Sequence, residues 1–248
     1  MIKLFRNIRK NLLNEGKTTR YFKYAIGEII LVVIGILIAL QINNWNNEAA
    51  NKRDEQNIVK NLNLEFKKNR KNLQESIKHH KQILSCATDV MNLIGEPKEV
   101  LNKHNLDSLL ERTLDYRSYK PSQAVVLDVI SSGKLNLISS DSLRLLIFDW
   151  SSNLEKNEEN YLTLDESNQD LVLTYLIKNA SMKNIDNYGI LQWNKKTKLY
   201  HDNYNMSQDI EFENVMDNHS WSILNYIMAL ENLENTMTRI IEETNKNF

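Results

Sequence analysis

A single long apolar run stands out near the start of the chain, in residues 22–42. From Ile29 to Leu40 it holds no polar side chain, and its only charges are Lys23 and Glu28. A helix of about 20 residues crosses the hydrocarbon core of a bilayer, and a helix satisfies its own backbone hydrogen bonds there. The pattern therefore predicts one transmembrane helix over residues 22–42.

Beyond this run, apolar residues recur every three or four positions, which is typical of helices with one buried face. In residues 48–94 the stripe consists of Ile58, Leu62, Phe66, Leu73, Ile77, Leu84 and Met91. Similar stripes predict helices over residues 106–119, 121–133, 141–180, 207–216 and 220–243. We predict an all-α fold, in which the single N-terminal transmembrane helix continues into an elongated antiparallel helical bundle formed by residues 43–248.

Residues 181–206 are the least helical stretch of this pattern. They contain Gly189, four aromatic residues and many asparagines. If the helix over residues 141–180 returns toward the membrane, this loop lies near the lipid headgroups. The alternative, which we favour, is a loop that caps one end of the bundle.

The turn-forming and cross-linking residues agree with a helical fold. The chain of 248 residues has six glycines and two prolines, whereas strand-and-turn architectures need more of both. Its single cysteine, Cys86, cannot form an intrachain disulfide.

Charge is distributed unevenly around the apolar run. The cations that precede or enter it are Lys3, Arg6, Arg9, Lys10, Lys17, Arg20 and Lys23, and no cation follows it before Lys52. Because cations near a span stay in the cytoplasm, we expect residues 1–21 to be a cytoplasmic basic arm. This arm is either an amphipathic helix on the inner leaflet or a disordered segment. Residues 43–248 are then extracytoplasmic, and Tyr21, Tyr24 and Trp45 lie where aromatic rings prefer the membrane interfaces.

A cleaved signal peptide shares the basic start and the apolar core. Here the core is too long, and the only small residues that could form a cleavage site, Ala49 and Ala50, follow a polar stretch. We therefore expect an anchor that is not cleaved.

One face of the span is unusual. At about 100° per residue, Glu28, Val32, Gly35 and Ala39 share one stripe. Gly35 and Ala39 form a small-xxx-small pair, which lets a second helix approach closely. An intramembrane carboxylate indicates function or a partner. The alternative is that Glu28 lies near the cytoplasmic interface and reaches toward Lys23.

No pattern predicts catalysis. Ser131 and Lys134 have an SxxK spacing, but the further motifs of such acyl-transfer enzymes are missing. His79, His80 and Cys86 share a helix, yet they supply too few ligands for a zinc site, and the thiol is better explained as a small buried residue. We therefore expect no enzyme activity, no cofactor and no bound metal.

The net charge excludes another class of partner. Seven cations and one acid give residues 1–24 a charge of +6, so residues 25–248 carry −7 of the overall −1. An acidic outer domain is not a nucleic-acid binder. The expected partners are the lipid bilayer and either a second copy of the chain or another membrane protein.

Residues 17–47, KTTRYFKYAIGEIILVVIGILIALQINNWNN, resemble the opening of an uncharacterised bacterial family of single-pass membrane proteins. Its members have a basic arm, a YxKYAIGEI-type entry, a VVIGILIALQINNWN span and a helical outer domain. Residues 131–144, SSGKLNLISSDSLR, resemble a second block of that family. The resemblance implies the bacterial inner membrane, with the N-terminus inside and the C-terminal domain in the periplasm. It implies no activity.

Three functions are compatible with these patterns. The first is an anchored scaffold or interaction protein, oligomeric or bound to a partner. The second is a ligand-sensing subunit that signals through a partner, since ligands bind between the helices of bundles. The third is an accessory subunit of an ion-driven membrane complex, in which Glu28 is a proton site.

Overall fold

The computed structural model describes residues 18–199 and 201–246, and within that part of the chain it contains helices and no strand. The all-α prediction is therefore confirmed. The chain divides into two compact units, Met1–Gln56 and Asn57–Phe248. The basic residues of the predicted arm, Lys3, Arg6, Arg9, Lys10 and Lys17, lie outside the described residues.

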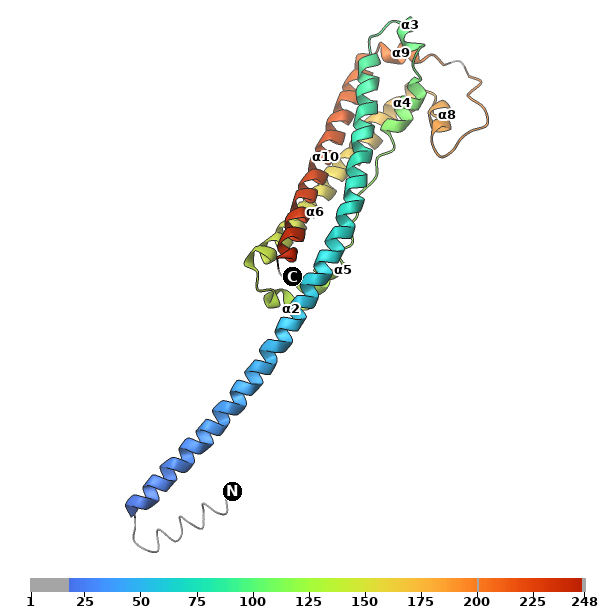
Figure 1. Ribbon diagram of the computed structural model, residues 1–248. Helices are drawn as coiled ribbons and strands as arrows, with labels where there is room; N and C mark the ends of the chain where they lie inside the picture. The colour runs from blue at the N-terminus through green and yellow to red at the C-terminus, as the bar shows by residue number, and fades with distance from the viewer. Residues whose placement is uncertain (1–17, 200, 247–248) are drawn as a thin grey trace. The chain divides into compact units, whose positions relative to one another are not determined.

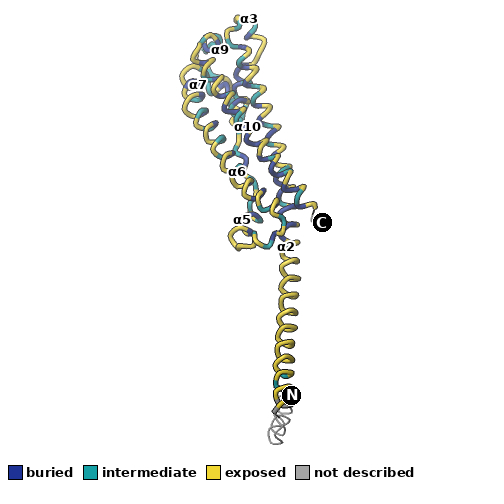
Figure 2. The backbone as a smooth tube through the Cα atoms, turned by 90° about the vertical axis from the view of Figure 1, so that its left-hand side faces the viewer, coloured by how far each residue is buried: buried dark blue, intermediate teal, exposed yellow. Residues whose placement is uncertain are grey.

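The first helix, α2, runs from Thr18 to Leu93, a length of 76 residues. Its apolar run is exposed: Ile29 is 63 % exposed and Leu37 58 %. From Ile58 onward most of the apolar residues of the same helix are buried (Figure 2). Among the described residues, this is the one helix long and apolar enough to cross a membrane. It differs from the core helix of a soluble protein because none of its most apolar window is buried.

In the unit Asn57–Phe248, α2 packs with two further long helices, α6 (Asp141–Ser167) and α10 (Ile210–Asn245) (Figure 1). Asn63 donates to Thr244 at 2.7 Å near one end, and the Gly95 N–H donates to the Ser207 carbonyl at 2.8 Å near the other. These contacts make α10 antiparallel to α2.

The direction of α6 follows from two further contacts with α10. Ser140 donates to Glu243 at 2.7 Å, and Ser167 donates to Asn218 at 2.7 Å. Because α6 and α2 both run antiparallel to α10, they run parallel to each other. The helix over residues 141–180 therefore leads away from the start of the bundle, and the alternative in which it returns is wrong.

Short elements connect the long helices. They are α3 (Lys98–Leu101), α4 (Leu106–Thr113), α5 (Ala124–Ser131), the 3-10 turn η1 (Lys134–Leu137), the π-helical turn η2 (Asn168–Leu173), α7 (Thr174–Asn179), α8 (Met182–Ile185), the 3-10 turn η3 (Asp186–Tyr188) and α9 (Asn203–Ser207). Asn105, Ser140 and Asp209 accept bonds from the first turns of α4, α6 and α10, as N-caps do. Residues 181–199 and 201–206 lie at the end of the bundle where α2 ends, which confirms the favoured position of that loop.

Three predicted helix boundaries are wrong. The helix expected over residues 106–119 ends at Thr113, and α5 begins at Ala124 rather than at Pro121. Between them the backbone bonds to side chains of α2 and α10 instead of forming a helix. The helices expected over residues 207–216 and 220–243 are one helix, α10, because its buried stripe continues through His219 without interruption.

The core lies where the three long helices face one another. Phe66 of α2 packs edge-on against Trp150 of α6, with ring centroids 5.1 Å apart, and both side chains are almost fully buried. Leu73, Tyr226 and Leu230 are also buried completely.

Replacing Phe66 with alanine is expected to lower the free energy of unfolding by about 3–5 kcal/mol, since it leaves a cavity beside Trp150. Leu64→Ala is the matched control, because Leu64 lies on the same helix and is 58 % exposed. Denaturant unfolding of the full-length protein in detergent, followed by tryptophan fluorescence, measures both. Equal losses in the two variants would contradict this packing.

Candidate functional site

The four residues of the predicted packing stripe lie on α2, where the helical repeat aligns them. Val32, Gly35 and Ala39 are exposed, and a Cβ added at Gly35 would meet nothing within 4 Å. Glu28 is partly buried. In this single chain, the face that carries Gly35 and Ala39 is open, so a second helix has room to approach it. The role of Glu28 stays a prediction.

The residues expected at the membrane interfaces also lie on α2. Lys23, Tyr24 and Trp45 are exposed, and Trp45 is 74 % exposed. Arg20 and Tyr21 belong to the helical backbone of α2, and their side chains lie outside the described part.

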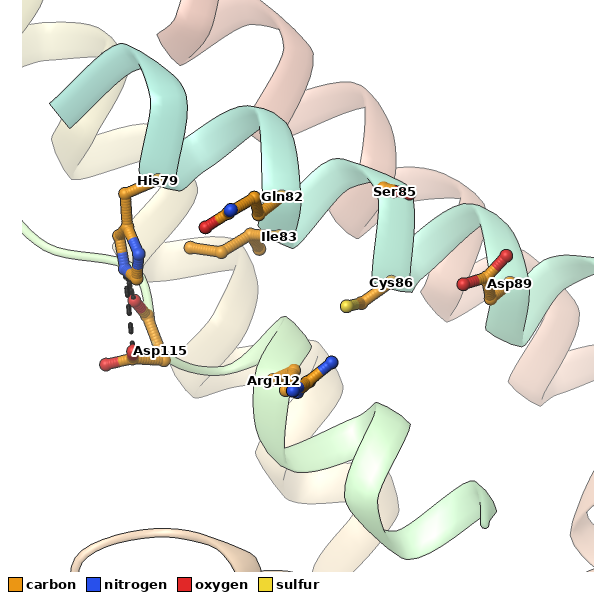
Figure 3. Close-up of a pocket in the computed structure, with 8 residues that line it drawn as sticks. All are labelled: His79, Gln82, Ile83, Ser85, Cys86, Asp89, Arg112 and Asp115. Atoms are coloured by element: carbon orange, nitrogen blue, oxygen red, sulfur yellow. Dashed lines mark hydrogen bonds and ion pairs between the residues drawn. The ribbon is translucent and has the colours of Figure 1, made fainter. Parts of the chain in front are cut away.

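In the outer unit, a groove of about 440 Å³ lies between α2 and α4 (Figure 3). Its lining residues are His79, Gln82, Ile83, Ser85, Cys86, Asp89, Arg112 and Asp115. His79 and Cys86 are seven residues apart and both face the groove, as their spacing predicts. Cys86 is half-buried rather than a core residue.

The charges of the groove fall into two groups. His79 donates from Nε2 to the Asp115 carbonyl at 2.7 Å and lies 3.5 Å from the Asp115 carboxylate, which also accepts from Arg117 at 2.9 Å. Within the described residues, Arg112 and Asp89 have no hydrogen-bond or ion-pair partner, so one cation and one anion face the groove unpaired. Such a groove suits a small polar molecule better than an apolar one.

The groove does not have the ligands of a metal centre. Among the described residues, no three His, Cys, Asp or Glu side chains come together as a metal site would need.

A second polar pocket, of about 260 Å³, lies at the end of the bundle where α3, α8 and α9 meet. Lys98 contacts Asp202 at 2.6 Å, and Asn203 donates to Asp107 at 2.9 Å. The Lys98 contact lowers the pKa of Asp202. Because these polar groups satisfy one another, the pocket holds the loop together and offers fewer open contacts than the groove.

The burial of polar side chains in the core was not predicted from the sequence. His80 and His219 are completely buried, and burial lowers the pKa of each imidazole. Their positions on the apolar stripes of α2 and α10 do indicate burial. Which backbone groups they bind depends on the tertiary packing.

Comparison with known proteins gives one family. The model of a family of unknown function (DUF6090) matches residues 28–161, which include most of the apolar run, the groove and most of α6. Neither the curated proteins nor the solved structures gave a match to the chain.

Alkylation of Cys86 measures how far the groove encloses the thiol. We expect iodoacetamide to modify Cys86 at least about threefold more slowly than a cysteine at exposed Thr88 in the variant C86S/T88C, because access limits the reaction of a half-buried thiol. The two rates should become equal in denaturant. Equal rates in the folded proteins would show that the groove does not shield Cys86.

Proposed function

The chain belongs to DUF6090, a family of unknown function, and we propose that it is a membrane-anchored interaction protein with an extracytoplasmic helical domain. In this proposal residues 22–42 span the bilayer as an uncleaved signal anchor. Residues 43–248 form the outer domain, which binds a partner or a second copy of the chain.

The change of environment along α2 carries this proposal. The apolar side chains of residues 22–42 are exposed. Burying one such large side chain would stabilise the protein by about 1.5–3 kcal/mol. From Ile58 onward the same helix buries its apolar face in the bundle. A lipid environment around residues 22–42 would bury their apolar side chains, as the bundle buries those of the second stretch.

The orientation rests on the cations before the span. Seven of them precede or enter the apolar run, and none follows it before Lys52, which favours an N-terminus in the cytoplasm. We place the protein in a bacterial inner membrane, with residues 43–248 in the periplasm.

An interaction role is favoured over catalysis and over nucleic-acid binding. The groove lacks a nucleophile paired with a base, which covalent catalysis needs. Residues 25–248 carry a net charge of −7, and this negative charge repels a phosphate backbone. The stripe through Gly35 and Ala39 is the proposed contact in the membrane, because small residues let helix backbones approach.

A second candidate function, ligand sensing, is favoured by the groove. Its volume of about 440 Å³ falls within the range of small-molecule pockets, roughly 300–1,000 Å³. The unpaired Arg112 and Asp89 on opposite walls would suit a ligand that carries both charges. Signalling would then pass through a membrane partner.

Topology can be measured with single cysteines in a C86S background. We expect a membrane-impermeant maleimide to label N47C in intact cells and to label N7C only after permeabilisation, because the two positions flank the span. The opposite pattern would reverse the proposed orientation. A mature chain that begins beyond Trp45 would exclude the anchor.

The stripe predicts a change in association. Gly35→Leu should weaken self-association, or capture of a membrane partner, by roughly tenfold, since a larger side chain separates the helix backbones; this factor corresponds to about 1.4 kcal/mol. Gly27→Leu makes the same change about 80° away around the helix and should have little effect. Cross-linking or energy transfer in bilayers measures both. If the two variants associate equally well, the stripe has no role in association.

A further inference from the structure

Residues 114–123 form a non-helical segment, here called the strap, that runs between α4 and α5. Aromatic side chains of α2 and α10 bind the backbone of alternate residues from Thr113, the last residue of α4, to Tyr119 of the strap. His219 donates from Nε2 to the Thr113 carbonyl at 3.0 Å, and His79 donates from Nε2 to the Asp115 carbonyl at 2.7 Å. The Arg117 N–H donates to His80 Nε2 at 3.3 Å. The Tyr119 N–H donates to the Tyr226 hydroxyl at 2.8 Å.

Further along, side chains of α2 bind Ser122 of the strap and Val125 in the first turn of α5. Asn69 donates to the Ser122 carbonyl at 2.7 Å and accepts from the Ser122 N–H at 3.1 Å, as a neighbouring strand would. The Glu65 carboxylate accepts from the Ser122 hydroxyl at 2.6 Å and from the Val125 N–H at 3.1 Å. Two of the side chains that bind the strap are therefore histidines and one is a carboxylate, and a third histidine, His219, binds the residue just before the strap.

The contacts of His80 fit only its neutral form. Nδ1 donates to the Ser76 carbonyl at 2.8 Å, so Nε2 carries the lone pair that accepts from Arg117 N–H. A proton on Nε2 would turn this acceptor into a donor that faces another donor. The imidazole is completely buried, so it could not turn to water instead.

His219 is also adapted to the neutral form. Its Nε2 donates to Thr113, and its Nδ1 is buried with no partner among the described residues. Protonation would place a charge and a donor in an apolar site, which is costly without a partner. Among the described residues no carboxylate bonds to this ring, which lies edge-on to Tyr116, and the Tyr116 hydroxyl donates to Asp165 at 2.7 Å.

We propose that the strap is a pH-sensitive latch, which loosens from α2 and α10 when His80 and His219 take up protons. This inference uses only contacts within the unit Asn57–Phe248 and does not depend on the membrane topology. Because Asp115 belongs both to the strap and to the wall of the groove, loosening the strap changes the groove that the sensing function would use.

The other groups around the histidines set the sign of the effect. Burial lowers the pKa of His80 and of His219, the cation of neighbouring His79 would lower that of His80 further, and Asp115 opposes this. The Tyr226 ring packs on His80, and burial raises the pKa of Tyr226 to about 12, so that hydroxyl stays neutral. A histidine whose pKa is lowered by folding contributes its full stability above the unfolded value of about 6.5 and loses it as pH falls.

The test uses a nitroxide label on the strap in the full-length protein, in lipid nanodiscs. The label is attached at exposed Lys120 in the variant C86S/K120C, and a control label at exposed Glu159 of α6 in C86S/E159C. As pH falls from about 7.5 to about 5, we expect the mobile fraction of the strap label to rise reversibly, with a midpoint below about 6.5. The control label should not change.

A further variant separates the histidines from the carboxylate. Glutamine at positions 80 and 219 can still donate or accept a hydrogen bond but does not titrate. In H80Q/H219Q the mobility change should disappear, and if the double variant does not fold, each single variant should reduce it.

Three results would overturn the proposal. The first is a strap label that does not respond to pH, and the second is a control label that responds equally, which indicates general unfolding. The third is a mobility change that persists in the glutamine variants, which would show that the two histidines do not cause it.

Discussion

The burial of apolar side chains along one helix is the constraint on which the rest of this structure depends. The helix α2 continues for 76 residues, yet its two ends meet different requirements. Residues 22–42 are apolar on all sides and need an apolar surrounding that the described chain does not supply. Residues from Ile58 onward are apolar on one face only, and that face is covered by α6 and α10. The bundle exists because this second stretch cannot bury its stripe alone.

The order of the helices follows from the same requirement. Since α2 and α6 run in parallel, the chain must return once between them, and it does so through α4, the strap and α5. An extended return path leaves backbone N–H and C=O groups without helical partners. Buried backbone groups of this kind need other partners, and here side chains of α2 and α10 provide them. The buried histidines His80 and His219 and the buried Asn69 therefore serve a non-helical crossing between helices.

This arrangement connects the interior of the bundle with its surface. His79 faces the groove and also binds the strap, while the adjacent His80 lies in the core against Tyr226. Asp115 lies at the junction, held by His79 and Arg117. A change in the position of His80 in the core would therefore be passed to Asp115 on the wall of the groove through one or two side chains. A protein whose surface groove depends on core contacts can respond to its surroundings without a separate regulatory domain.

The sequence by itself determined the helical class, the apolar run and most of the long helices, because these depend on local periodicity and on the small number of breaking residues. It also placed His79 and Cys86 on one face, since that follows from seven-residue spacing. Only the tertiary structure decided that α6 runs parallel to α2, that residues 114–123 are not helical although Leu114 continues the apolar stripe of α4, and that α10 is unbroken. Those features depend on contacts between residues far apart in the chain, such as Asn69 with Ser122 and His219 with Thr113, and a local pattern carries no information about which distant partner a side chain will meet.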